Sequence, residues 1–341
     1  CWQVAAQAPP HLDAIIVRSG TDDVYTEWTN PGGLPRPYMY ENYAPLMAAY
    51  NLAPPTRALA GERWSEIWQE RLERSVPWGI GFIHHLVDGP YWRDRSVCPD
   101  YDRIRCAVFV VGGWADWYYH PLLRAFSQRN VPKRALIGPW SHMWPDDAVP
   151  GPRIDGNREY ARWFDQFLKG IDTGVLDEPP VTLFLRHWRD PSTVYAQDNG
   201  EYRAEDAWPP VRVVQTPLYL AAGGLLVDKP EGADDGGASY RYDPGIGAMA
   251  GKHGGGAFRP WGRPLGQRRD GALSLCYTAE PLAEPLELIG VPHAILHVEF
   301  DAPGAALVVK LADVAPDGTS ALVTKGYLNA THRESHSSPE P

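Results

Sequence analysis

The runs AVFVVGGWAD at residues 107–116 and RALIGPWSH at 134–142 decide the fold of this 341-residue chain. Each contains a short apolar run that ends in glycine, the pattern of a buried strand followed by a tight turn. Between them, PLLRAFS at 121–127 is typical of a helix. A strand, a helix and a second strand in this order form a β–α–β unit, with parallel strands and a right-handed crossover. We therefore predict an α/β protein built on a parallel sheet.

Two side chains capable of acid–base chemistry follow these strands. Asp116 ends the first run and His142 ends the second, 26 residues further along the chain. This spacing places both on adjacent loops at the carboxyl edge of the sheet, where open α/β sheets bind ligands. A carboxylate beside an imidazole fixes its tautomer and stabilises the imidazolium, as the general base of a serine nucleophile requires. Two structural roles stay open at this point: Asp116 as a helix N-cap and His142 as a packed loop residue.

The rest of the chain divides into stretches with different hydrophobic patterns. An apolar run at 14–17 predicts a further strand, 38–100 reads as a helical insertion, and 157–170 predicts an aromatic-rich helix that ends at Gly170. After about residue 210 the helical pattern disappears, and the Gly-rich stretch 231–256 predicts a long surface loop. The short alternating runs there are typical of an antiparallel sandwich. The expected strands are 218–220, 273–277, 294–300, 306–311 and 321–324.

Composition excludes several classes of protein. The net charge is −10, which argues against a nucleic-acid partner. No apolar run approaches the roughly 20 residues that span a bilayer, so we expect a soluble protein with no membrane partner. The compartment stays open, with the cytoplasm slightly favoured over secretion because the true N-terminus is not seen. The four cysteines form no CxxC pair, and His84-His85 have no third ligand at a matching spacing, so no metal site is predicted.

The two loop motifs resemble the acid and histidine motifs of the cocaine esterase-like hydrolases, a family that includes X-Pro dipeptidyl-peptidases, glutaryl acylases and α-amino acid ester hydrolases. Further segments are similar to this family in the same order. Trp2-Gln3 with residues 9–15 resembles the helix and strand that follow the nucleophile in the family, and residues 88–93 resemble the end of its helical cap. Residues 280–290 resemble the entry to its jelly-roll domain, and residues 313–318 resemble a turn within that domain. The resemblance therefore covers essentially the whole chain.

The resemblance implies an α/β-hydrolase core, a helical cap and a C-terminal jelly roll of the galactose-binding type. We expect the core at 1–37 and 101–175, the cap at 38–100 and the jelly roll at 210–341. It also implies that the core lacks its N-terminal half and that the jelly roll is incomplete at its C-terminal end. By resemblance, Asp116 and His142 are the acid and base of a catalytic triad.

The nucleophile of the family is a Ser in a G-x-S-x-x-G elbow, and no stretch of this sequence matches that motif. Ser19 lacks the elbow glycine, and Ser141 comes after the acid in chain order. In the family the elbow precedes the segment that corresponds to Cys1, so we expect the chain to begin just after its nucleophile and to be inactive alone. The implied reaction is hydrolysis of an ester, amide or X-Pro peptide bond through an acyl-enzyme, without a cofactor.

Other assignments weigh less. Trp117, Tyr118 and Trp140 flank the two motif residues and are candidates for a substrate pocket, which favours aromatic side chains.

One alternative function is a carbohydrate- or partner-binding sandwich on a vestigial hydrolase core, which would not need the Asp116/His142 pair. Another is an amidase in which Cys1 is an N-terminal nucleophile. The substrate is expected to be a small ester, amide or peptide, and the sequence leaves the oligomeric state open.

Overall fold

The computed structural model describes residues 1–128, 130–230, 237–247 and 263–340. The chain divides into two compact units. The first comprises Cys1–Gly20, Tyr101–Leu296 and Lys310–Lys325, and the second Thr21–Asp100, His297–Val309 and Gly326–Pro341. Most of the loop expected at 231–256 lies outside the described residues.

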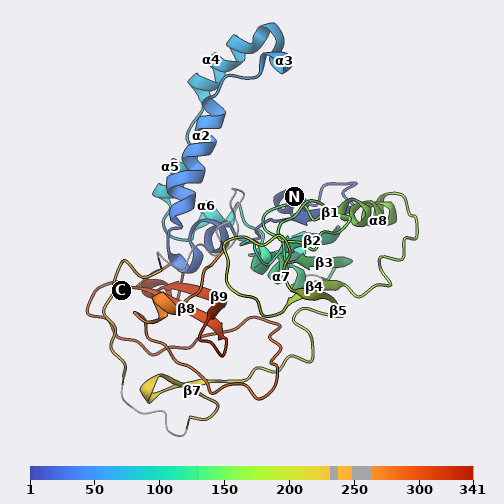
Figure 1. Cartoon of the computed structure of the whole chain (residues 1–341). Coiled ribbons are helices and arrows are strands. Elements are labelled where there is room, and N and C mark those ends of the chain that lie inside the picture. Colours follow the sequence, from blue (N-terminus) through green and yellow to red (C-terminus); the bar gives the residue numbers. More distant parts are fainter. Residues whose placement is uncertain (129, 231–236, 248–262, 341) are drawn as a thin grey trace. The chain divides into compact units, whose positions relative to one another are not determined.

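A five-stranded sheet forms the centre of the first unit (Figure 1). In spatial order its strands are β1 (Ala14–Arg18), β2 (Ala107–Gly113), β3 (Lys133–Gly138), β4 (Val181–Arg186) and β5 (Gly200–Glu205). The first four strands run parallel, and β5 pairs antiparallel with β4. The predicted parallel β–α–β arrangement is therefore confirmed, whereas β4 and β5 were not predicted.

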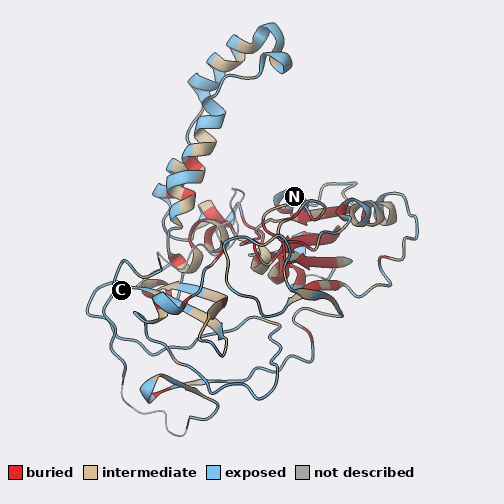
Figure 2. Cartoon of the chain, viewed as in Figure 1, coloured by how far each residue is buried: buried red, intermediate tan, exposed pale blue. Residues whose placement is uncertain are grey.

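The first unit contains helices, of which α7 and α8 pack against this sheet. The helices are α1 (Trp2–Ala5), α7 (Tyr119–Ser127) and α8 (Gly156–Leu168), with a short α9 (Arg268–Gly271) further along the chain. All seven residues of β2 are buried (Figure 2). Phe109 packs against Trp163 of α8, with ring centroids 5.6 Å apart, while Gly112 faces Leu122 of α7. Because residues three apart on a strand point to opposite faces, both faces of β2 are covered, which explains its unbroken apolar run.

The second unit is mainly helical. Its helices are α2 (Ala44–Leu52), α3 (Arg57–Ala60), α4 (Trp64–Arg74), α5 (Gly79–His84) and α6 (Pro90–Arg93), preceded by π-helical turns at Val24–Thr29 and Tyr38–Tyr43. Its core is aromatic: Tyr25, Phe82 and Trp92 are buried together. This unit, which includes Tyr25, begins at Thr21. Within the described residues, none of the helices is long and apolar enough to cross a membrane.

The C-terminal part contains fewer strands than expected. The strands form a hairpin of β6 (Tyr219–Ala221) with β7 (Leu225–Val227) and a pair of β8 (Ala306–Val314) with β9 (Ser320–Asn329). Of these, β6, β8 and β9 correspond to the strands expected at 218–220, 306–311 and 321–324. The strands expected at 273–277 and 294–300 are absent from the described structure. An apolar run forms a strand only where a neighbouring strand accepts its hydrogen bonds. In these two stretches, Leu275 and Val298 are about half exposed. This part also does not separate as a compact unit of its own.

A buried histidine ties the C-terminal residues of the second unit to its helical core. His332 is 7% exposed, its Nε2 lies 3.3 Å from the Tyr25 hydroxyl, and its Nδ1 lies 2.9 Å from the Thr331 hydroxyl. The Tyr25 hydroxyl donates to the Leu86 carbonyl at 2.8 Å. Burial, together with the nearby His336, lowers the pKa of His332. Folding therefore favours the neutral form of this imidazole.

We expect His332 to make stability fall on acidification. Its folded pKa is depressed below the unfolded value of about 6.5, so the unfolded state binds the proton more readily. The contribution of His332 to stability is complete above about pH 6.5 and is lost as the pH falls below it. Urea unfolding between about pH 5 and 8 should show this slope in the native chain and a flatter one in His332→Gln. The exposed His84→Gln variant is the control, and an equal slope in His332→Gln would contradict the assignment.

Candidate active site

Parallel pairing of β2 with β3 positions two loops side by side. Gly113 pairs with Gly138 at the ends of the strands. Beyond them, the Trp114 N–H donates to the Gly138 carbonyl at 2.9 Å and the Ala115 N–H to the Trp140 carbonyl at 3.0 Å. The loops can approach because Gly113 has no side chain: a Cβ there would lie 2.1 Å from the Trp140 carbonyl oxygen. The close approach fixes the backbone on which both predicted residues stand.

Asp116 and His142 meet across these loops. His142 Nδ1 lies 2.9 Å from Asp116 Oδ2. The Asp116 side chain is fully buried, while 28% of the His142 side chain is exposed. The Trp117 N–H donates to Asp116 Oδ1 at 2.7 Å, so both carboxylate oxygens are held. In the tautomer that carries its proton on Nδ1, His142 donates to this carboxylate and Nε2 is the proton acceptor.

The three candidate pocket residues differ in position. Trp117 and Tyr118 are partly exposed, and the Tyr118 ring centroid lies 5.5 Å from that of His142. Trp140 is only 1% exposed and belongs to the hydrophobic core beneath the loops. Its indole N–H donates to the Pro152 carbonyl at 2.8 Å, and its ring packs on Gly138. The expectation that Trp140 lines a pocket is therefore replaced by a packing role, because its ring points into the protein.

The Ser141 side chain makes its hydrogen bond away from the acid–histidine pair. It is 2% exposed, and its hydroxyl donates to the Val149 carbonyl at 2.6 Å. A hydroxyl held in this way supports the conformation of the loop that carries His142. The role agrees with the sequence, which places Ser141 in the wrong chain order for the nucleophile.

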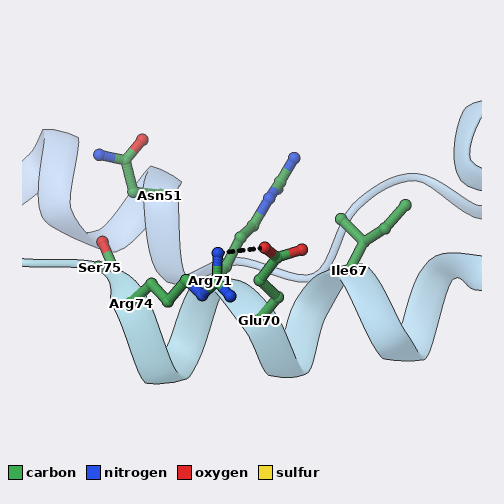
Figure 3. Close-up of a pocket in the computed structure, with 6 residues that line it drawn as sticks. All are labelled: Asn51, Ile67, Glu70, Arg71, Arg74 and Ser75. Carbon is green, nitrogen blue, oxygen red and sulfur yellow. Dashed lines mark ion pairs between the residues drawn. The ribbon is translucent and has the colours of Figure 1, made fainter.

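Hollows of very different size occur among the described residues. A groove of about 490 Å³ lies between α2 and α4 and is lined by Ile67, Arg71 and Arg74, among others (Figure 3). Neither residue of the acid–histidine pair lines it. A much smaller cavity of about 20 Å³ borders Ala115, the residue before Asp116, and also touches Arg186 and Arg263. Sequence reasoning did not single out these arginines, since they lie far from the two motifs along the chain.

Metal ligands do not gather in the part of the chain that the structure describes: no three His, Cys, Asp or Glu side chains come together there. The adjacent pair His84 and His85 has another role. The His85 ring stacks on Tyr91 with centroids 4.0 Å apart, and its Nδ1 lies 2.7 Å from the Gly81 carbonyl oxygen. His85 is therefore a packing residue of the helical unit.

A parallel sheet with a buried carboxylate and an imidazole on adjacent carboxyl-edge loops is the arrangement of an α/β hydrolase. Residues 1–144 match the model of the X-Pro dipeptidyl-peptidase (S15) family. Residues 173–341 match that of the X-Pro dipeptidyl-peptidase C-terminal non-catalytic domain. The chain belongs to the cocaine esterase-like/X-Pro dipeptidyl-peptidase family of serine hydrolases, as its motifs predicted.

Individual relatives agree with this assignment. The chain is 29% identical to a putative serine esterase of Mycobacterium bovis, over 78% of this chain and 41% of the relative. It is 26% identical to the cocaine esterase of a Rhodococcus species, over 99% of this chain and 64% of the relative. It therefore spans about 41% to 64% of the length of these curated relatives.

Solved structures support the fold. An α-amino acid ester hydrolase matches 99% of this chain and 62% of its own, with a TM-score of 0.67 at 20% identity. An aminopeptidase from a marine sediment thaumarchaeon matches 99% of this chain and 61% of its own, with a TM-score of 0.61 at 17% identity. The fold is thus an α/β hydrolase core with a C-terminal sheet region.

Proposed function

We propose that this chain carries the acid and the base of a serine hydrolase that cleaves an ester, amide or X-Pro peptide bond of a small substrate. The observation that carries the proposal is the 2.9 Å contact between Asp116 Oδ2 and His142 Nδ1, made by a fully buried carboxylate. A buried carboxylate on an imidazole nitrogen raises the basicity of the opposite nitrogen and stabilises the imidazolium. A protein that only binds its partner has no need of such a pair.

In the proposed reaction, His142 Nε2 takes the proton of the serine hydroxyl as the oxygen attacks the carbonyl carbon. The imidazolium is stabilised by Asp116 and then donates the proton to the leaving group. The resulting acyl-enzyme is hydrolysed when His142 activates water in the same way. Trp117 and Tyr118, on the Asp116 loop, are proposed to border the substrate.

The proposed serine is not identified among the 341 residues of this sequence. No G-x-S-x-x-G stretch, the motif that holds the nucleophile of the family, occurs among them. Cys1 is the exposed N-cap residue of α1, where its carbonyl accepts a hydrogen bond from the Ala5 N–H at 2.9 Å. Cys1 thus stands at the start of a helix and makes its first backbone hydrogen bond, which favours a structural role over that of an N-terminal nucleophile.

The test compares the 341-residue chain with a product extended upstream through the preceding coding sequence. A fluorophosphonate probe, which labels activated serines, should label the extended protein and not the chain alone. The extended protein should also hydrolyse 4-nitrophenyl esters. Labelling of the 341-residue chain at one of its own serines, or ester turnover equal to that of the extended protein, would contradict the proposal.

A further inference from the structure

Three guanidinium groups surround one buried carboxylate in the first unit. The Asp198 side chain is 3% exposed. Arg263 Nη1 lies 3.2 Å from Asp198 Oδ2, Arg186 Nε lies 3.8 Å from the same oxygen, and Arg189 Nη1 lies 3.9 Å from Oδ1. Three positive charges share a single negative charge, so the cluster carries a net charge of about +2.

Arg263 is the most enclosed of the three. Its side chain is 8% exposed, and its guanidinium lies 4.8 Å from the centroid of the Tyr195 ring. Burial lowers the pKa of Arg263, and repulsion by Arg186 lowers it further. Among the described residues, its side-chain hydrogen bond goes to Asp198, whereas a guanidinium carries five N–H donors. A buried cation with donors to spare is costly unless an anion completes its environment.

Arg263 and Arg186 both line a cavity beside the proposed catalytic acid. The cavity of about 20 Å³ is lined by Arg186, Arg263, Trp114 and Ala115, with Leu322 of β9 among its apolar walls. Its volume accommodates one or two water-sized groups. Arg186 is the last residue of β4, which runs parallel to β2 and β3, so it stands at the same edge of the sheet as Asp116 and His142.

We propose that Arg263 and Arg186 form an anion subsite that binds a carboxylate of the substrate, and that the enzyme prefers substrates with a free carboxylate near the scissile bond. The planar fork of a guanidinium matches a carboxylate with two parallel hydrogen bonds. A cavity of one or two water volumes suits two carboxylate oxygens better than a tetrahedral phosphate. The preference rests on the proposed function, whereas binding of the anion does not.

The kinetic test uses the extended protein that carries the nucleophile. The value of kcat/KM is measured for 4-nitrophenyl hemisuccinate, which is anionic, and for 4-nitrophenyl pentanoate, a neutral ester of similar length. We expect Arg186→Met and Arg263→Met each to lower the anionic-to-neutral ratio about tenfold, the effect of one lost charge-assisted hydrogen bond. Arg189→Met is the matched control, since Arg189 shares Asp198 but does not line the cavity. Its ratio should change less than about threefold.

A second measurement separates failure of the subsite from failure of the proposed function. Succinate binding to the extended protein is followed by saturation-transfer NMR, with pentanoate as the neutral-tailed comparison. Succinate should bind the native protein and lose its signal in Arg186→Met, a change at a side chain that is about one third exposed. Thermal unfolding of the variant checks that it is folded. The subsite would be overturned if the anionic-to-neutral ratio of kcat/KM were the same in Arg186→Met, Arg263→Met and Arg189→Met. It would also be overturned if Arg186→Met left succinate binding unchanged. If neither ester is hydrolysed, the proposed function fails while succinate binding still decides the subsite.

Discussion

Replacing Asp116 by Asn in the extended, catalytically complete protein should lower kcat about ten-thousand-fold. The amide presents an N–H₂ donor where the carboxylate accepts the proton of His142 Nδ1 at 2.9 Å. Two donors cannot face each other, so the imidazole would move its proton to Nε2 and lose its function as a base. His142→Ala, which removes the base itself, should cost at least about a thousand-fold.

The measurement is the steady-state hydrolysis of a 4-nitrophenyl ester, together with thermal unfolding to show that each variant is folded. Asp147→Asn is the control, because Asp147 is an exposed aspartate on the His142 loop. Its activity should stay within about twofold of the native value. If Asp116→Asn retained more than a tenth of the native kcat, Asp116 would not be the acid of a triad.

Replacing Gly113 by Ala should destabilise the protein by about 3 kcal/mol or more. A Cβ at this position would lie 2.1 Å from the Trp140 carbonyl oxygen and 2.7 Å from its carbonyl carbon. These are backbone atoms of the adjacent loop, so the clash can be relieved only by separating the loops that carry Asp116 and His142. The same variant in the extended protein should therefore lose activity as well as stability.

Two other glycines provide graded controls for urea unfolding. At Gly112 the added Cβ would lie 2.6 Å from Leu122 Cδ1, the end of a side chain that can shift, so we expect a loss of about 1 kcal/mol. At Gly326 nothing lies within 4 Å, and the change should stay within about 0.5 kcal/mol. A Gly113→Ala variant as stable as Gly326→Ala would show that the two loops do not approach as described.

The central strands were predictable because their residues are buried on both faces. β2 and β3 read as short apolar runs closed by glycine, a pattern that survives without tertiary information. β5 could not be recognised, because Gly200–Glu205 is largely polar and gains its conformation from pairing with β4. The same dependence on a partner explains why the strands expected at 273–277 and 294–300 do not form. Their composition suits a strand, but no partner strand runs along them in the described structure.

The acid–histidine pair was predictable from topology, since the carboxyl ends of neighbouring parallel strands meet at one edge. The direction of the Trp140 ring was not, because a residue in a turn can face either side of the backbone. The cluster of Arg186, Arg189 and Arg263 was also beyond prediction. Its members are brought together by long-range folding, and no local pattern connects Arg263 to Asp198.

The pairing of Asp116 with His142 is tested most directly by proton NMR of the 15N-histidine-labelled 341-residue chain, which needs neither substrate nor nucleophile. We expect a slowly exchanging, strongly downfield Nδ1–H signal from His142 that disappears in His142→Gln and is lost or moves upfield in Asp116→Asn. The signal should be unchanged in Asp147→Asn. A His142 imidazole that carries its proton on Nε2, with no signal that responds to Asp116→Asn, would contradict the catalytic pair.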